Sequence, residues 1–90
     1  MIVVYLIARH MEGGYRHEHI AQVRWRNPAD GASDVSTREE MVRWIVAGNQ
    51  AFVADGQRQI GVRVVRAMPP YIQTYAAGIW TDNLLALPTF

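Results

Sequence analysis

The sequence predicts an α+β fold, in which a small, mainly antiparallel β-sheet of about four to five strands packs against one α-helix in the order β-β-α-β-β-(β). Three observations lead to this prediction. Short β-branched segments occur in both halves of the chain, one amphipathic segment with capping residues lies between them, and glycine- or proline-containing turns separate the segments. Because no linker or repeat interrupts the pattern, we expect residues 1–90 to form a single domain.

The first part of the chain is predicted to form a β-hairpin. Residues 2–8 are apolar and mostly β-branched, as in a strand covered on both faces. A Gly-Gly pair supplies the reversal. Residues 19–26 then alternate, which places Arg24 and Arg26 on one face and apolar side chains on the other. The turn sequence at residues 27–31 ends this second strand.

One α-helix is expected over residues 37–47. Ser36 and Glu39 have the spacing of a capping box at its start, and Gly48 can provide the left-handed stop at its end. Apolar side chains lie on one stripe of this segment and charged side chains lie opposite, so one face of the helix should cover the sheet.

The second half of the chain is predicted to add further short strands. Residues 51–54 and 60–66 are separated by a tight Asp-Gly turn, and two consecutive prolines end the second of these strands. Residues 71–75 and 79–80 then suggest a final hairpin. Residues 81–85 have the residue preferences of a single helical turn.

Composition excludes several classes of function. The absence of cysteine rules out disulfides, thiolate nucleophiles and cysteine-ligated metals. The net charge of +1 is too small to indicate nucleic acid or an anionic membrane through long-range attraction. The apolar run at residues 1–8 is too short to span a bilayer and lacks a basic leader, so we expect a cytoplasmic protein without membrane contact.

No reaction motif is complete in this sequence. Neither of the two serines sits in a glycine-flanked nucleophile elbow, and the Gly-Gly pair lacks the pattern and the following helix of a phosphate-binding loop. The sequence therefore favours a protein that is not an enzyme and that carries no cofactor.

Three histidines gather around the reversal of the first hairpin. His17 and His19 are separated by one residue, so on a regular strand both imidazoles point the same way, and His10 can approach from the partner strand. Such a set could hold a metal ion or a small ligand. The alternative is that the imidazoles lie at the rim of the core and bond to backbone groups.

A second candidate site is a recognition surface made mainly of arginine and aromatic side chains. Its members are Arg24, Arg26, Arg63, Arg66, Tyr71, Tyr75, Trp80, Asp82 and Asn83. Arginine and aromatic side chains anchor protein interfaces, and on a sheet they can also stack bases. The first hypothesis is a protein partner or a homodimer, and the alternative is nucleic acid on the same face. In a structural interpretation the aromatics fill the core, Asp82 caps a turn and Asn83 bonds to backbone.

Four segments resemble one protein family. The stretches GGYRHEHIAQVRW, STREEMVRWI, PPYIQTY and GIWTDNLLALP occur in an order similar to small bacterial proteins of domain-of-unknown-function family 3892. The resemblance covers residues 5–88. It implies a short stand-alone bacterial or phage-associated domain without an assigned activity, and it brings no catalytic residues.

Overall fold

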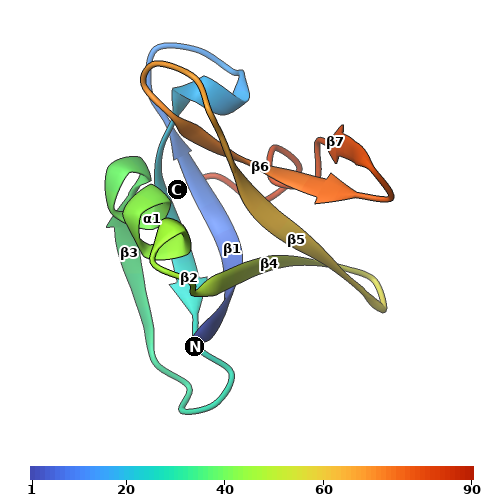
Figure 1. The fold of residues 1–90 in the computed structure, drawn as a ribbon. Coiled ribbons are helices and arrows are strands. Elements are labelled where there is room, and N and C mark those ends of the chain that lie inside the picture. Colours follow the sequence, from blue (N-terminus) through green and yellow to red (C-terminus); the bar gives the residue numbers. More distant parts are fainter.

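The computed structural model describes residues 1–90 and shows a seven-stranded mixed sheet with one α-helix (Figure 1). The strands are ordered β3-β2-β1-β4-β5-β6-β7 across the sheet. Only β1 and β4 run parallel, and every other neighbouring pair is antiparallel. In chain order the elements are β1 (Val3–Met11), η1 (His17–His19), β2 (Ile20–Arg26), β3 (Ser33–Thr37), α1 (Arg38–Val46), β4 (Gln50–Asp55), β5 (Arg58–Val65), β6 (Tyr71–Ala76) and β7 (Ile79–Thr81).

The predicted α+β fold with four to five strands is wrong, because the chain is mostly β-structure. The unexpected strand is β3, which pairs with β2 from Thr37 opposite Gln22 to Ser33 opposite Arg26. This strand lies at an edge of the sheet, and its side chains are exposed or half-buried. It therefore needs no apolar alternation, which is the signal that marks a strand in a sequence.

The helix begins one residue later than its predicted capping box. Thr37 is the N-cap: its Oγ1 accepts from the amide of Glu40 at 3.1 Å, and the Glu40 carboxylate accepts from the amide of Thr37 at 2.8 Å. Ser36 does not cap, because it is still paired in β3 and its Oγ accepts from the Trp25 indole.

No helix of the structure has the length and apolar character needed to cross a membrane.

The sheet curls around α1, which packs against β2 and β3 on one side and against β5 and β6 on the other (Figure 1). The core fills the space inside this curl. Leu6, Ile20 and Ile72 are almost fully buried in it, and Met41 and Val42 contribute the apolar face of α1. In β5, Ile60 and Val62 are buried on the side of the core and Arg63 is exposed on the opposite face.

The C-terminal segment closes a gap in the sheet. β4 pairs with β1 only at Val3–Tyr5, which leaves the second half of β1 without a neighbour on that side. Residues 88–90 take this place: the Arg9 amide donates to the carbonyl of Pro88 at 2.9 Å, and the Phe90 amide donates to the carbonyl of Arg9 at 3.0 Å. The two ends of the chain are therefore joined through β1.

Candidate functional site

One row of residues crosses six neighbouring strands on the face of the sheet that is turned away from α1, which we call the outer face. Residues in register on neighbouring strands point to the same face, and successive residues of a strand alternate. The row lies outside because both strand neighbours of Tyr5, Phe52 and Gly61 are buried in the core, as is Thr74 beside Tyr75. In register from β2 to β7, the row consists of Arg26, Tyr5, Phe52, Gly61, Tyr75 and Trp80.

Four members of this row are aromatic, and we call them the aromatic row: Tyr5, Phe52, Tyr75 and Trp80. The ring centroids of Tyr5 and Phe52 are 6.3 Å apart, and those of Tyr75 and Trp80 are 5.1 Å apart in an edge-to-face arrangement. Both pairs fall within the usual range for aromatic contacts. The rings therefore support one another on the surface, where Trp80 stays 45% exposed.

Gly61 interrupts the aromatic row between its two pairs. A Cβ added at Gly61 would meet no atom within 4 Å, so the space above this residue is open. Phe52 and Tyr75 lie on the two strands that flank it. Two strand spacings separate the backbones of these strands by about 9.5 Å. A planar ring with van der Waals contacts of about 3.5 Å on each side fits such a slot.

Three arginine side chains lie on the outer face together with the aromatic row. The Arg63 guanidinium carbon lies 4.3 Å from the centre of the Tyr75 ring, and Arg26 stands opposite Tyr5 in the register. Arg24 lies further along β2, with its guanidinium 5.0 Å from the centre of the Phe90 ring. No strand position on the outer face is acidic, because the exposed Asp34 and Asp55 belong by register to the opposite face and the other six acidic residues lie outside the strands. The charged side chains at the strand positions of the outer face are therefore all arginines, although the whole chain is almost neutral.

A comparison with known families agrees with the resemblance in the sequence. The family described as "Protein of unknown function (DUF3892)" matches residues 7–88 of the 90 residues. The chain belongs to DUF3892. Searches of the curated proteins and of the solved structures gave no match. Membership of DUF3892 assigns no activity, so the function of this DUF3892 domain has to be argued from its own geometry.

The predicted recognition residues of the DUF3892 domain divide into two groups. Arg24, Arg26, Arg63, Tyr75 and Trp80 lie on the outer face with the aromatic row. Tyr71, at the start of β6, alternates onto the same face, and Arg66 follows β5 as an exposed residue. The other group consists of Asp82 and Asn83.

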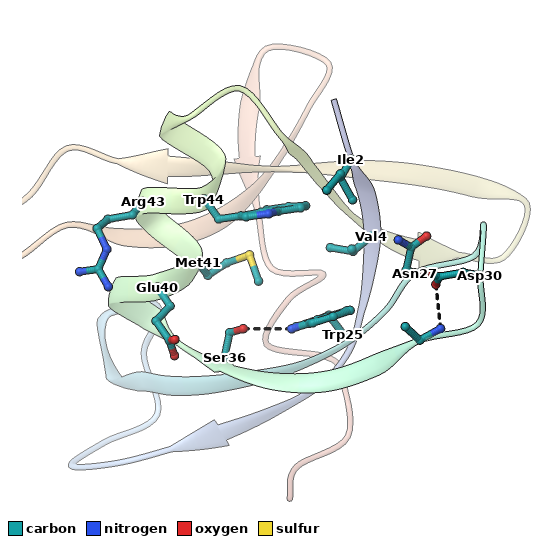
Figure 2. Close-up of a pocket in the computed structure, with 11 residues that line it drawn as sticks. Ile2, Val4, Trp25, Asn27, Asp30, Ser36, Glu40, Met41, Arg43 and Trp44 are labelled. Carbon is teal, nitrogen blue, oxygen red and sulfur yellow. Dashed lines mark hydrogen bonds between the residues drawn. The ribbon is translucent and has the colours of Figure 1, made fainter.

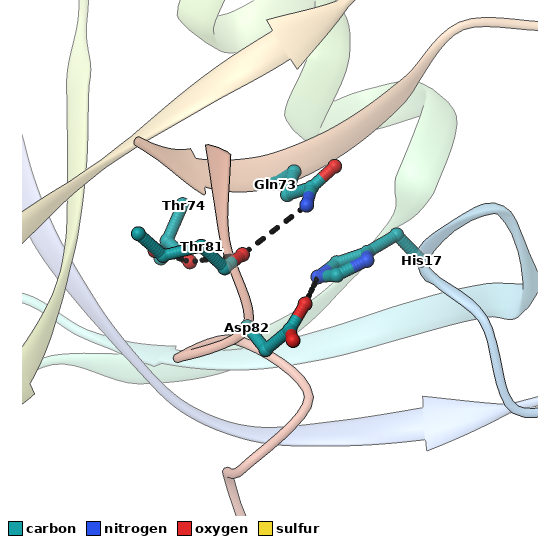
Figure 3. A network of polar contacts seen from close by, with 5 residues as sticks. All are labelled: His17, Gln73, Thr74, Thr81 and Asp82. Carbon is teal, nitrogen blue, oxygen red and sulfur yellow. Dashed lines mark hydrogen bonds and ion pairs between the residues drawn. The ribbon is translucent and has the colours of Figure 1, made fainter. Parts of the chain in front are cut away.

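Asp82 and Asn83 lie apart from the outer face, in the segment after β7. Nδ2 of the Asn83 side chain donates to the carboxylate of Asp55 at 3.1 Å. Oδ1 of Asp82 lies 3.9 Å from Nε2 of His17 (Figure 3). Neither side chain makes the backbone hydrogen bond that a structural role predicts. The expected single turn is present, because the amide of Ala86 donates to the carbonyl of Asp82 at 3.2 Å.

The prediction that His17 and His19 point the same way from a strand is wrong, since both lie in the 3-10 helix η1. Nδ1 of His19 accepts from the amide of Arg16 at 3.3 Å, whereas the side chain of His17 turns toward Asp82. Nδ1 of His10 contacts the main-chain oxygen of Phe90 at 2.6 Å. No group of three histidine or acidic side chains suited to a metal ion is formed, so metal binding stays a prediction without a preformed site.

Sequence reasoning missed Tyr5, Phe52 and Gly61, which complete the row. Each alternates with buried neighbours in an apolar strand, and that alternation was the available signal for an outward position. The register that aligns the three residues is set by the pairing of β1, β4 and β5, which no local pattern records. A hydrogen bond from the side-chain amide of Gln59 to the Tyr5 hydroxyl helps to hold the Tyr5 end of the aromatic row in place.

Proposed function

We propose that this DUF3892 protein is a non-enzymatic binding domain that takes up single-stranded nucleic acid on the outer face of its sheet. Unpaired bases would stack on the aromatic row, and the phosphates would meet Arg24, Arg26 and Arg63. The observation that carries the proposal is the continuous register of Tyr5, Phe52, Gly61, Tyr75 and Trp80 across the sheet.

Stacking supplies the first part of the argument. Sheet-based proteins that bind single strands use exposed aromatic rings, each of which contributes about 1–3 kcal/mol per stacked base. The aromatic row offers rings in register, and the open space above Gly61 leaves room for a base between Phe52 and Tyr75. A duplex would not fit this chemistry, because its bases are already stacked on one another.

Charge supplies the second part. A phosphate backbone is repelled by carboxylates, and the outer face has none on its strands. Three phosphate contacts would give a slope of about −2 in a plot of log affinity against log salt concentration for a single strand. The small net charge of the chain makes the expected affinity modest and dependent on this local arrangement.

The test is a fluorescence-anisotropy titration with labelled single-stranded DNA and RNA of mixed sequence, at one low and one higher salt concentration. We expect Tyr75→Ala and Trp80→Ala each to weaken binding at least about fivefold, in line with the loss of one stacked base. Tyr15→Ala is the matched control, because Tyr15 is a 90% exposed aromatic residue in the loop between β1 and η1.

Arginine variants separate phosphate contact from a general charge effect. Arg63→Ala should weaken binding and lower the magnitude of the salt slope by about 0.7, the contribution of one phosphate on a single strand. Arg58→Ala removes the same charge from the same strand, but at a position in register with Asp55 on the inner side. Equal losses in both variants, or binding without salt dependence, would contradict the proposal.

A protein partner or a second copy of the chain is the other candidate, and a separate observation favours it. β7 is an edge strand of three residues, and Ile79 and Trp80 on it are 64% and 45% exposed. Exposed apolar edges invite pairing with another strand. Light scattering over a range of concentrations tests self-association: a dimer that Ile79→Lys dissociates would support this candidate, and a monomer at every concentration would reject the homodimer.

A further inference from the structure

A cavity of about 550 Å³ lies on the other side of the sheet, between α1 and the strands β1, β2 and β3 (Figure 2). Most of its wall is apolar and comes from Trp25, Trp44, Met41, Val4 and Ile2. Its volume falls within the range of about 300–1,000 Å³ that is typical of small-molecule sites. The outer face does not contribute to this cavity, so the two sites are separate.

The indole rings of Trp25 and Trp44 form two walls of the cavity. Figure 2 shows Trp25 and Trp44 on opposite sides of it, with Met41 and Val4 between them. The indole N–H of Trp25 donates to Oγ of Ser36 at 3.0 Å, so the polar edge of this ring is already satisfied. What Trp25 can offer a ligand is therefore its π-face rather than a hydrogen bond.

The backbone of Trp44 is bonded to Asn49, which follows α1. The amide group of Asn49 donates to the carbonyl of Trp44 at 3.1 Å, and its Oδ1 accepts from the amide of Ile2 at 3.0 Å. These two bonds tie the end of α1 to the start of β1, and residues from both elements line the cavity. They therefore hold together the two elements that form this part of the cavity wall.

Carboxylates line the cavity at two places. Asp30 belongs to the loop between β2 and β3, where its Oδ1 accepts from the amide of Ala32 at 2.9 Å, and Glu40 belongs to the first turn of α1. Hydrogen bonding to the backbone of Thr37 lowers the pKa of Glu40, so this carboxylate is ionised at neutral pH. Arg43 also borders the cavity, and its charge adds to the lowering of the pKa of Glu40. Figure 2 shows the Arg43 guanidinium and the Glu40 carboxylate both extending away from the space between the two indoles, so Glu40 lies at the margin of the cavity.

From the paired indole walls and the two carboxylates at the margin of the cavity we infer that this cavity binds a small organic cation, with an ammonium group near the faces of Trp25 and Trp44 and an apolar stem in the remaining space. Tryptophan is the best aromatic partner for such cations, because its ring face carries negative potential. Glu40 and Asp30 balance the ligand's charge, while Met41, Val4 and Ile2 contact its stem.

The test uses NMR titrations of the indole N–H signals with three probes: benzyltrimethylammonium, choline, and dimethylbutanol, the neutral isostere of choline. We expect the signals of Trp25 and Trp44 to shift while that of Trp80 stays in place, because Trp80 lies on the outer face. Choline should bind at least about tenfold more tightly than dimethylbutanol, and benzyltrimethylammonium more tightly than choline. Equal binding of choline and dimethylbutanol, or no shift with either cation, would overturn the inference.

Two variants locate the site within the fold. Glu40→Gln removes the charge and keeps a side chain that can complete the capping box, and it should weaken cation binding several-fold. Glu39→Gln is the matched control, since Glu39 lies on the same helical turn but does not line the cavity. Equal weakening by both variants would contradict a local role for Glu40.

A further titration distinguishes two possible sources of the cation, a modified protein tail and a free metabolite. A peptide that contains trimethyllysine carries the same ammonium group as choline, so tighter binding of the peptide would assign the site to a modified protein tail. Tighter binding of choline would assign it to a free metabolite. In all arms, Trp44→Leu should abolish cation binding without affecting the nucleic-acid titration, which keeps the two proposals independent.

Discussion

The imidazole of His17 and the carboxylate of Asp82 come together from opposite ends of the chain, with Nε2 of the one 3.9 Å from Oδ1 of the other (Figure 3). His17 is only 8% exposed, and its Nε2 has no hydrogen-bond partner. Burial lowers the pKa of His17, and the negative charge of Asp82 offsets only part of this effect. The folded protein therefore disfavours the protonated imidazole.

This relationship predicts a loss of stability in mild acid. An unfolded histidine has a pKa of about 6.5, so just below that pH the unfolded chain binds more protons than the folded one. The stabilising effect of a neutral His17 is thus complete above about pH 6.5 and is lost as the pH falls toward the folded-state pKa. We expect the urea midpoint to fall between about pH 7.5 and about pH 5.5, and to fall less in His17→Gln.

Asp82→Asn provides the complementary measurement. Asp82 raises the pKa of His17, so its removal should lower that pKa further and make the acid-induced loss larger. Because the side chain of Asp82 is 86% exposed, we expect little change in stability above about pH 7.5. A smaller acid-induced loss in Asp82→Asn than in the wild type would contradict this account.

The start of α1 shows what local sequence patterns can and cannot predict. Ser36–Glu39 and Thr37–Glu40 both satisfy the spacing of a capping box, so the sequence predicts a helix here but leaves its first residue ambiguous. The pairing of β3 with β2 decides between them. It holds Ser36 in the strand opposite Val23, where its hydroxyl faces the Trp25 indole.

Hydrogen exchange can verify which residue caps the helix. Thr37→Ala should cost about 1 kcal/mol and should speed amide exchange in the first turn of α1, because the amide of Glu40 loses its acceptor. Ser36→Ala should leave that turn unchanged and instead expose the indole N–H of Trp25 to faster exchange. If Ser36→Ala loosened the first turn more than Thr37→Ala, the cap would be assigned to the wrong residue.

Only part of the outer face could be predicted from the sequence, because strand register is not visible in local patterns. Arg63, Tyr75 and Trp80 could be identified because alternation within β5 and the hairpin of β6 and β7 are local features. Tyr5 and Phe52 could not be added to them. Their alignment depends on the parallel pairing of β1 with β4, two strands separated in sequence by β2, β3 and α1.

Gly61→Val tests whether the space in the aromatic row is used. The φ angle of Gly61 is not positive and an added Cβ would meet open space, so valine is expected to leave stability unchanged or raise it by up to about 1 kcal/mol. The new side chain would occupy the slot between Phe52 and Tyr75 and should weaken nucleic-acid binding at least about tenfold. Unchanged affinity in this stable variant would show that no base enters there.

Leu84→Ala tests whether the C-terminal segment is part of the core. Leu84 is fully buried, although it lies after the last strand, and it packs in the same cluster as Val62 and Ile72. Truncation of a buried leucine costs about 2–5 kcal/mol, a large share of the stability of a small domain. Leu85→Ala is the matched control, because Leu85 is only half-buried at the edge of that cluster, and it should cost less than half as much. Urea denaturation at neutral pH measures both losses. A loss of less than about 1 kcal/mol in Leu84→Ala would contradict a place for this segment in the core.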